Sequence, residues 1–573
     1  MRRILLRKIL AAVLCAVLIG TALPGQERAD LDMVTKIRLE GFRNSKVMET
    51  ASRLMDSIGP RLTGSPNMKK ANDWTREQLE DWGLANAHLE SWGPFGRGWS
   101  YEQSTARMIS PDQWEMLALP VAWTPGTNGP LRAPAVRFKL IEKEDLEKAK
   151  GKLAGKILLI GELREVRPQE RGLSERYDEK GLTDLSRYEI PGLTPYRRPG
   201  QPPFNREEFL KRRQFARELA KFLVEEKVAA VIEPGPQLEG GTFRVQGVNN
   251  GWKKDAPPNV PTLVMAIEQF GRVARMLDRK EDVQLELNVA TRFYDGDGMS
   301  YNTIAEIPGT DKKGEIVMLG GHMDSWHAGT GATDNGAGVV VAMEAVRILK
   351  ALNVHPRRTI RIALWSGEEQ GLLGSKAYVA QHFGSRPQPQ GGDSDLPSFL
   401  RPESGPVTVK PDHAKFSAYF NLDNGTGKVR GVYTQENTAV VPIFQAWIEP
   451  LKDLGVTAIT NRNTGGTDHL SFDAVGLPGF QFIQDEVEYE PRTHHTNQDV
   501  YERLQREDLM QASVVMAWFV YNAATRDAMM PRKPMPKAEL RRSEEPAPAE
   551  KGPLARPEPT AAPVSAPTPR AAS

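Results

Sequence analysis

Cysteine is almost absent from this chain of 573 residues, in which Cys15 is the single example. Cys15 lies in an N-terminal apolar run, residues 9–19, so a mature protein that has lost this run contains no thiol. Disulfide frameworks, cysteine nucleophiles and thiolate metal sites are thereby excluded. The fold must depend on its hydrophobic core, and any bound metal must be held by nitrogen and oxygen ligands.

The chain also lacks an excess of charge of either sign. Lys and Arg number 75 and Asp and Glu number 73, which gives a formal net charge of +2. Four cations and no acids lie in residues 1–25, so removing them leaves 71 against 73 and a net charge of −2. Such a balanced surface provides no electrostatic basis for nucleic acid as a partner.

No apolar run is long enough for a membrane span. Residues 9–19 are eleven in number, whereas a transmembrane helix needs about 20 apolar residues. Four basic residues precede this run and small residues follow it at positions 20–22, which is the pattern of a cleaved export signal. We therefore expect an exported protein, periplasmic or secreted, with no membrane span after signal removal.

The remaining chain has the composition of a globular protein, with 39% apolar and 26% charged residues. Between residues 315 and 524 short apolar runs alternate with helical stretches, which predicts an α/β fold with a mixed, largely parallel sheet flanked by helices. The expected organisation is a signal peptide at 1–25, a main domain built from 26–115 and 286–527, an inserted domain at 116–285 and a disordered Pro/Ala-rich tail at 528–573.

Residues suited to metal chemistry concentrate in four places, which the sequence puts at the carboxyl ends of predicted strands. They are His322 and Asp324 in 321–324, Asp334 in 332–338, Glu368 and Glu369 in 365–371, and Asp423 together with His495 in the loop 494–499. Open α/β sheets bind their ligands at this end of the strands. Two adjacent carboxylates such as Glu368 and Glu369 repel each other unless a cation lies beside them.

The candidate ligands comprise two imidazoles, three or four carboxylates and no sulfur. This set suits two divalent ions that share one carboxylate, and zinc accepts both ligand types in low coordination. Zinc lowers the pKa of bound water to about 7. A carboxylate that lies beside the metals without binding them can carry the proton of that water to a leaving amine, and one of the paired glutamates is suitably placed.

Several motifs, taken in their order and spacing, resemble the co-catalytic di-zinc exopeptidases, which include secreted aminopeptidases and glutamate carboxypeptidases. These motifs are GHMDSW, GATDNGAG, RTIRIALWSGEEQGLLGS, FNLDN, GGTDHLSF and HHTNQD, with SIGPRLTGS at 57–65 near the start. The resemblance covers about residues 47–525 and implies the zinc exopeptidase fold with an inserted β-rich protease-associated domain.

The resemblance also implies a role for each candidate residue. In the implied site His322 and Asp423 hold one zinc ion, Glu369 and His495 hold the other, Asp334 bridges the two, Glu368 is the general acid/base, and Asp324 orients His322. His494 is assigned to the substrate, although a solvent-facing histidine fits the sequence equally well. Asp468 and His469 are expected in a structural turn.

These observations predict an exported zinc-dependent exopeptidase that hydrolyses terminal peptide bonds of short peptides or dipeptides by a metal-activated water. A glutaminyl-cyclase-like acyltransferase with a single zinc, or a catalytically silent binding module on the same fold, are the alternatives. The sequence leaves open whether the enzyme recognises the amino or the carboxyl terminus. The resemblance allows a homodimer, which no pattern of residues requires. Two polar stretches, 162–211 and 384–411, depart from the family pattern and leave the shape of the substrate entrance open.

Overall fold

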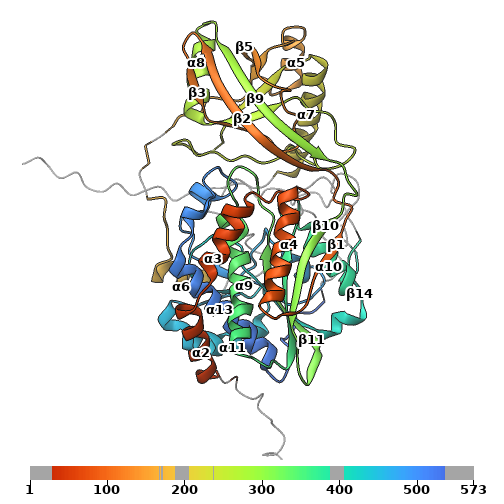
Figure 1. The fold of residues 1–573 in the computed structure, drawn as a ribbon, viewed down its shortest axis with the longest axis vertical. Coiled ribbons are helices and arrows are strands. Elements are labelled where there is room, and N and C mark those ends of the chain that lie inside the picture. The colour runs from red at the N-terminus through yellow and green to blue at the C-terminus, as the bar shows by residue number, and fades with distance from the viewer. Residues whose placement is uncertain are drawn as a thin grey trace, which may run out of the picture. The chain divides into compact units, whose positions relative to one another are not determined.

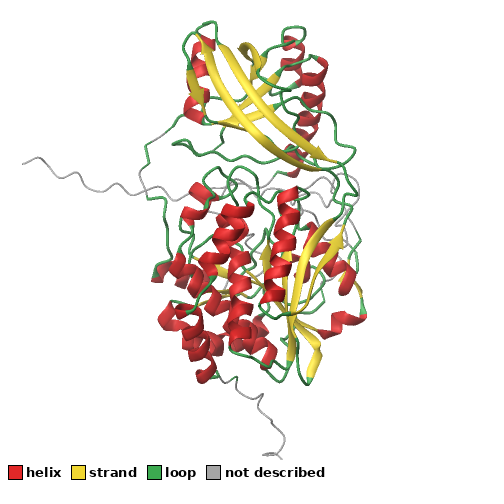
Figure 2. Ribbon diagram, viewed as in Figure 1, coloured by secondary structure: helices red, strands yellow, loops and turns green. Residues whose placement is uncertain are grey.

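The structure is a computed structural model. The residues it describes are 27, 29–166, 168–169, 172–187, 205–236, 238–387 and 405–535. The predicted signal peptide, most of the predicted tail and the middle of both polar stretches lie outside these residues. Within the described part of the chain the strands form two eight-stranded sheets and one two-stranded sheet (Figures 1 and 2).

The first sheet is mixed, and its centre is parallel. Its strands, in spatial order, are β1 (Ala85–Trp92), β10 (Ser300–Ile307), β12 (Arg358–Trp365), β11 (Lys312–His322), β15 (Phe416–Asn421), β18 (Gly479–Gln484), β16 (Val429–Tyr433) and β17 (Ala458–Thr460). β11 pairs in parallel with β12 and β15, and β15 pairs in parallel with β18. The expected mixed, largely parallel sheet is confirmed for this core.

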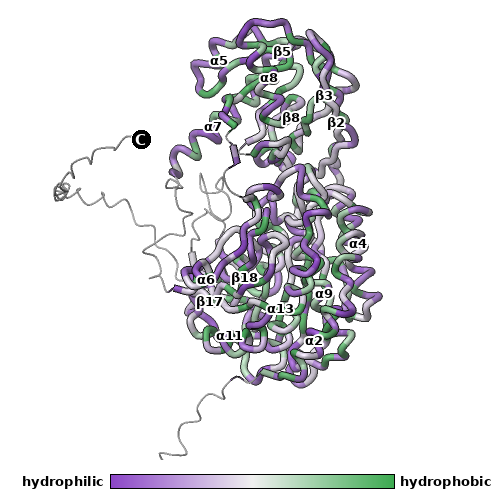
Figure 3. Tube along the Cα trace, turned by 90° about the vertical axis from the view of Figure 1, so that its left-hand side faces the viewer, coloured by the Kyte–Doolittle hydropathy of each residue, from purple (hydrophilic) through white to green (hydrophobic). Residues whose placement is uncertain are grey.

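Helices cover both faces of this sheet because its central strands are apolar on both sides. In β11, Val317 and Leu319 face one hydrophobic cluster, while Ile316 and Met318 face another. The first cluster includes residues of α2 (Leu31–Arg43), α3 (Val47–Ser52), α4 (Pro66–Asp81), α9 (Ala337–Ala351), α11 (Val441–Ile448) and α13 (Arg506–Thr525). The second includes residues of α10 (Leu373–His382) and α12 (His469–Asp473). In Figure 3, α4 is mostly hydrophilic along its trace, as a helix with one face in solvent should be.

The apolar pattern of residues 443–454 predicts a single helix, but the segment consists of two pieces. α11 ends at Ile448 and a 3₁₀ helix, η7, follows over Glu449–Leu454. Pro450 lies in the first turn of η7. Proline lacks the backbone N–H that would continue the α-helix and its ring clashes with the carbonyl four residues earlier, so the change of helix type occurs here.

The second sheet is built from strands between Gly98 and Tyr294, so it also uses residues on both sides of the predicted segment 116–285. Its strands, in spatial order, are β3 (Trp114–Met116), β2 (Gly98–Ser110), β9 (Gln284–Tyr294), β5 (Leu131–Arg137), β6 (Ile157–Leu159), β7 (Ala230–Pro234), β8 (Thr262–Met265) and β4 (Ala118–Pro120). Three helices pack against this sheet, namely α5 (Lys143–Ala149), α7 (Arg206–Glu225) and α8 (Ile267–Asp278). Separate hydrophobic clusters lie on its two faces.

The described parts of the two polar stretches contain short regular elements. Residues 172–187 include α6 (Glu179–Ser186), whose Leu182 packs with Tyr433, Ala458 and Ile483 of the first sheet. β13 (Gly384–Ser385) and β14 (Thr408–Val409) pair across the second stretch. None of the helices among the described residues combines the length and the apolar character that a membrane span requires.

Candidate metal centre

The candidate residues meet because three neighbouring parallel strands end together. In the register of the sheet His322 pairs with Trp365, and Gly320 pairs with Asn421. The residues that directly follow β12 and β15 therefore emerge beside His322. In this way strand pairing brings Glu368, Glu369 and Asp423 to the same edge of the sheet.

A first cluster forms around the His322 ring. His322 Nε2 lies 3.4 Å from Asp334 Oδ1 and 3.4 Å from Asp423 Oδ1. All three side chains are almost completely buried. Their ligand atoms are close enough together for one metal ion to contact all three.

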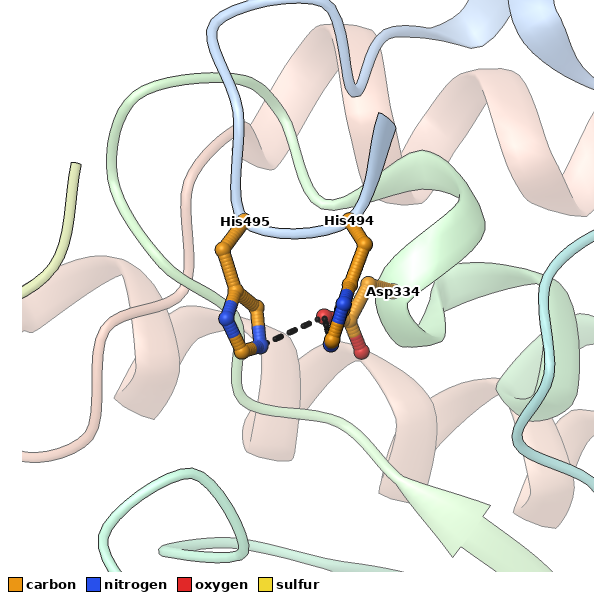
Figure 4. Close-up of side chains that lie close together, drawn as sticks. All are labelled: Asp334, His494 and His495. Carbon is orange, nitrogen blue, oxygen red and sulfur yellow. Dashed lines mark ion pairs between the residues drawn. The ribbon is translucent and has the colours of Figure 1, made fainter. Parts of the chain in front are cut away.

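A second cluster shares Asp334 with the first. His495 Nε2 lies 3.0 Å from Asp334 Oδ2 and 3.1 Å from Glu369 Oε2. Asp334 thus turns one oxygen towards each cluster, which is the arrangement of a bridging carboxylate. Figure 4 shows that His494 and His495 point from one loop towards Asp334. His494 Nε2 lies 3.8 Å from Asp334 Oδ2.

Asp499 holds the loop that presents Asp334. Its Oδ1 accepts hydrogen bonds from Thr333 N at 2.6 Å and Thr333 Oγ1 at 2.8 Å, and its Oδ2 accepts one from Asp334 N at 3.2 Å. Asp499 had no predicted role. The sequence does contain a signal for a role of Asp499, because it is the last residue of the motif HHTNQD and lies four residues after His495.

Arg61, in the motif SIGPRLTGS, is a second residue that sequence reasoning missed. The side chain is completely buried, and its guanidinium donates to backbone carbonyls. Nε donates to Met323 O at 2.7 Å, Nη1 to Thr330 O at 2.7 Å and Nη2 to Gly331 O at 2.8 Å. Arg61 therefore ties the backbone after His322 to the backbone before Asp334.

Asp324, expected to orient His322, chiefly holds the turn of the paired glutamates. Its carboxylate accepts hydrogen bonds from Glu368 N at 3.2 Å, from Glu369 N at 3.3 Å and from Thr63 Oγ1 at 2.8 Å. His322 Nδ1 lies 3.0 Å from the backbone carbonyl oxygen of Asp324 and 3.6 Å from its carboxylate. The nearer partner of the ring is thus the carbonyl group.

Two further neighbours have no predicted role, although one of them, Trp326, is the last residue of the motif GHMDSW. Trp326 Nε1 donates to Glu369 Oε2 at 2.6 Å, and the Gln246 side chain lies 3.0 Å from His495 Nδ1. His469, by contrast, contacts Thr464 O at 3.1 Å within its turn, and burial lowers its pKa to about 4.

Burial and mutual charge shift the pKa of His495, Glu369 and Glu368 at this centre. Burial opposes protonation of His495, but the charges of Glu369 and Asp334 outweigh it and raise its pKa to about 10. Burial raises the pKa of Glu369 to about 7, although His495 acts in the opposite direction. Burial also raises the pKa of Glu368 well above its usual value, against the nearby charge of His322.

The buried acids have more oxygen atoms than the surrounding donors satisfy. Asp334 Oδ2, Glu369 Oε1 and Asp423 Oδ1 are buried and make no hydrogen bond among the described residues. Buried polar atoms are costly when they lack a partner. Unbonded carboxylate oxygens that face two imidazoles fit divalent cations, so the donor set passes the test for a metal site.

The comparisons with known proteins agree with this geometry. Residues 302–520 match the model of Peptidase family M28. Carboxypeptidase Q of Mus musculus is 25% identical over 502 residues, which cover 87% of this chain and 90% of that one. A peptidase M28 precursor from Shewanella amazonensis SB2B has the same fold, with a TM-score of 0.59 at 24% identity over 88% of this chain and 98% of that chain. A zinc aminopeptidase from Bacillus subtilis gives a TM-score of 0.52 at 20% identity over 85% and 96% of the two chains.

Fold, site and relatives together define a metallo-exopeptidase. The resemblance to co-catalytic exopeptidases that the motifs carry, carboxypeptidase Q included, is confirmed. The similarity to peptidase family M28 extends over residues 302–520.

Proposed function

We propose that the chain is an exported, zinc-dependent exopeptidase that cleaves the terminal peptide bond of short peptides or dipeptides. In this proposal the enzyme binds two Zn²⁺ ions and uses Glu368 as the general acid/base. The observation that carries it is the pair of His–carboxylate clusters that share Asp334 and leave three buried carboxylate oxygens without hydrogen bonds. We interpret the second sheet as an inserted protease-associated domain.

His322, Asp334 and Asp423 would hold one ion, and Asp334, Glu369 and His495 the other. His495 is preferred to His494 as a ligand because its Nε2 is 3.0 Å from Asp334 Oδ2, against 3.8 Å for His494. His494 would instead contact the substrate. When bound, zinc would supply an acidified water and polarise the scissile carbonyl group.

Glu368 would move the proton. Its Oε2 lies 3.9 Å from His322 Nε2, beside the first cluster. A buried carboxyl group whose pKa is raised can exchange a proton at neutral pH. Its carboxylate would take a proton from the attacking water and return it to the amine nitrogen that leaves.

The test is Glu368→Gln, with Glu102→Gln, at an exposed position of β2, as the matched control. We expect E368Q to retain its fold and two zinc ions but to lose about 10²- to 10⁴-fold in kcat, the usual contribution of a general acid/base. E102Q should keep the parental rate. Parental turnover by E368Q would exclude Glu368 as the proton carrier.

Elemental analysis of the purified protein tests the number of ions, and two zinc ions per chain are expected. A single ion together with cyclising activity would contradict the proposal and favour the acyltransferase. Hydrolysis of a dipeptide library with each terminus blocked in turn, with and without a chelator, establishes which end is recognised. Cell fractionation with and without residues 1–25 tests export.

A further inference from the structure

The loop that carries His495, residues 485–499, contains two strained residues. Val487 has φ = 50° and His495 has φ = 62°, and both are in the left-handed region that glycine favours. A β-branched residue is rarely found there, because its Cβ crowds the backbone. Such conformations persist only where surrounding structure imposes them.

Two segments from the second-sheet region, defined as residues 98–294, form backbone hydrogen bonds with these same two residues. Val487 N donates to Glu175 O at 2.7 Å, and Glu175 N donates to Val487 O at 3.0 Å. Val245 N donates to His495 O at 3.1 Å. Each strained residue of the loop is therefore held by a backbone hydrogen bond from outside the loop.

Further contacts extend both attachments. Next to Glu175, Arg176 Nη1 lies 3.1 Å from Asp485 Oδ2. Next to Val245, Phe243 N donates to Asn497 Oδ1 at 3.0 Å. The loop is thus attached near its beginning by residues 175–177 and near its end by residues 241–246.

Gln246 completes the second attachment at the His495 ring. His495 Nε2 faces Asp334 and Glu369, so a metal at that nitrogen requires the proton on Nδ1. The Gln246 amide lies 3.0 Å from Nδ1, and a half-turn of the amide places its carbonyl oxygen there as the acceptor. Partners of this kind orient a histidine ligand and raise its basicity.

We propose that these two segments hold the His495 loop in its metal-binding shape and that Gln246 is the positioning residue for the His495 ring. Residues of the second-sheet region would then help to form one of the two metal positions. The inference rests on the proposed function, because it assumes that His495 binds zinc. The other position, at His322 and Asp423, has no contact of this kind with Gln246 and serves as an internal reference.

The experiment measures zinc release from the fully loaded protein to a chromogenic chelator, with Gln246→Leu as the test variant. Gln246 is exposed, so this change leaves the core intact. We expect one of two release phases to accelerate by about 10- to 100-fold and the other to keep its rate. Gln246→Glu, which retains an acceptor oxygen, should restore slow release. Gln103→Leu, at an exposed position of β2, is the matched control and should behave as the parent.

The outcomes separate the inference from the proposed function. If both phases of Q246L keep the parental rates, Gln246 does not position His495 and the inference is overturned. A Q246E variant that releases zinc as fast as Q246L would also overturn it, because the acceptor would then be irrelevant. Arg176→Ala should accelerate the same phase, and an unchanged rate would exclude the attachment at 175–177. A parental protein that holds no zinc would instead refute the proposed function.

Discussion

Asp499 offers the sharpest test of how Asp334, the proposed bridging carboxylate, is held. In Asp499→Asn one acceptor oxygen remains, and it can keep the two bonds from Thr333. The new amide group then turns its N–H towards Asp334 N, where the parent had an acceptor at 3.2 Å. The variant loses the hydrogen bond that fixes Asp334 and gains a contact between two donors.

The size of the effect follows from the charge that the Asp499 acceptor carries above its pKa, which burial and the charge of Asp334 raise to about 7. A hydrogen bond to a charged group contributes about 1.5–3 kcal/mol, which corresponds to about 10- to 100-fold in a binding constant. Asp334 touches both clusters, so both zinc affinities should fall. Gln246→Leu, in contrast, should weaken one of them.

Competition for zinc with a fluorescent chelator measures both affinities. Thr333→Val is the matched control, because it removes the hydroxyl donor and leaves both backbone donors to Asp499 in place. Its loss should be smaller than that of D499N. The reasoning is refuted if D499N binds both zinc ions as tightly as the parent, or if T333V binds them less tightly than D499N does.

Three further predictions concern buried neighbours of the centre. Burial lowers the pKa of His327 to about 4, so in mildly acidic solution the unfolded chain binds a proton at this residue and the native protein does not. The free energy of unfolding should therefore be highest above the unfolded pKa of about 6.5 and fall by about 2 kcal/mol between pH 7 and pH 5. Urea unfolding of His327→Gln should lack that decrease. Arg61→Lys cannot supply the planar set of donors to the carbonyl groups of Met323, Thr330 and Gly331 and should lower the free energy of unfolding by about 3 kcal/mol or more; an unchanged melting temperature would contradict this. Trp326→Phe removes the N–H bond to Glu369 and should weaken one zinc position about 10-fold in the same chelator assay, with the position at His322 as reference.

The residues of the centre were predictable because their signals are local in the chain. His322 and Asp324 end a strand, Glu368 and Glu369 follow one, and each motif is read within a few residues. The strand and helix pattern of the first sheet is likewise a matter of short-range periodicity. Pro450 shows the limit of periodicity, since the apolar pattern continues through it while the α-helix does not.

The sequence by itself determined the α/β architecture, the list of candidate ligands and the family resemblance, because apolar periodicity and motif order survive without coordinates. Only the tertiary structure decided which groups hold those ligands in place. Asp499 bonds to Thr333 across 166 positions, Arg61 to Met323 across 262 and Gln246 to His495 across 249. Such partners depend on the direction of single donor and acceptor atoms after folding, and no spacing within the chain encodes that direction.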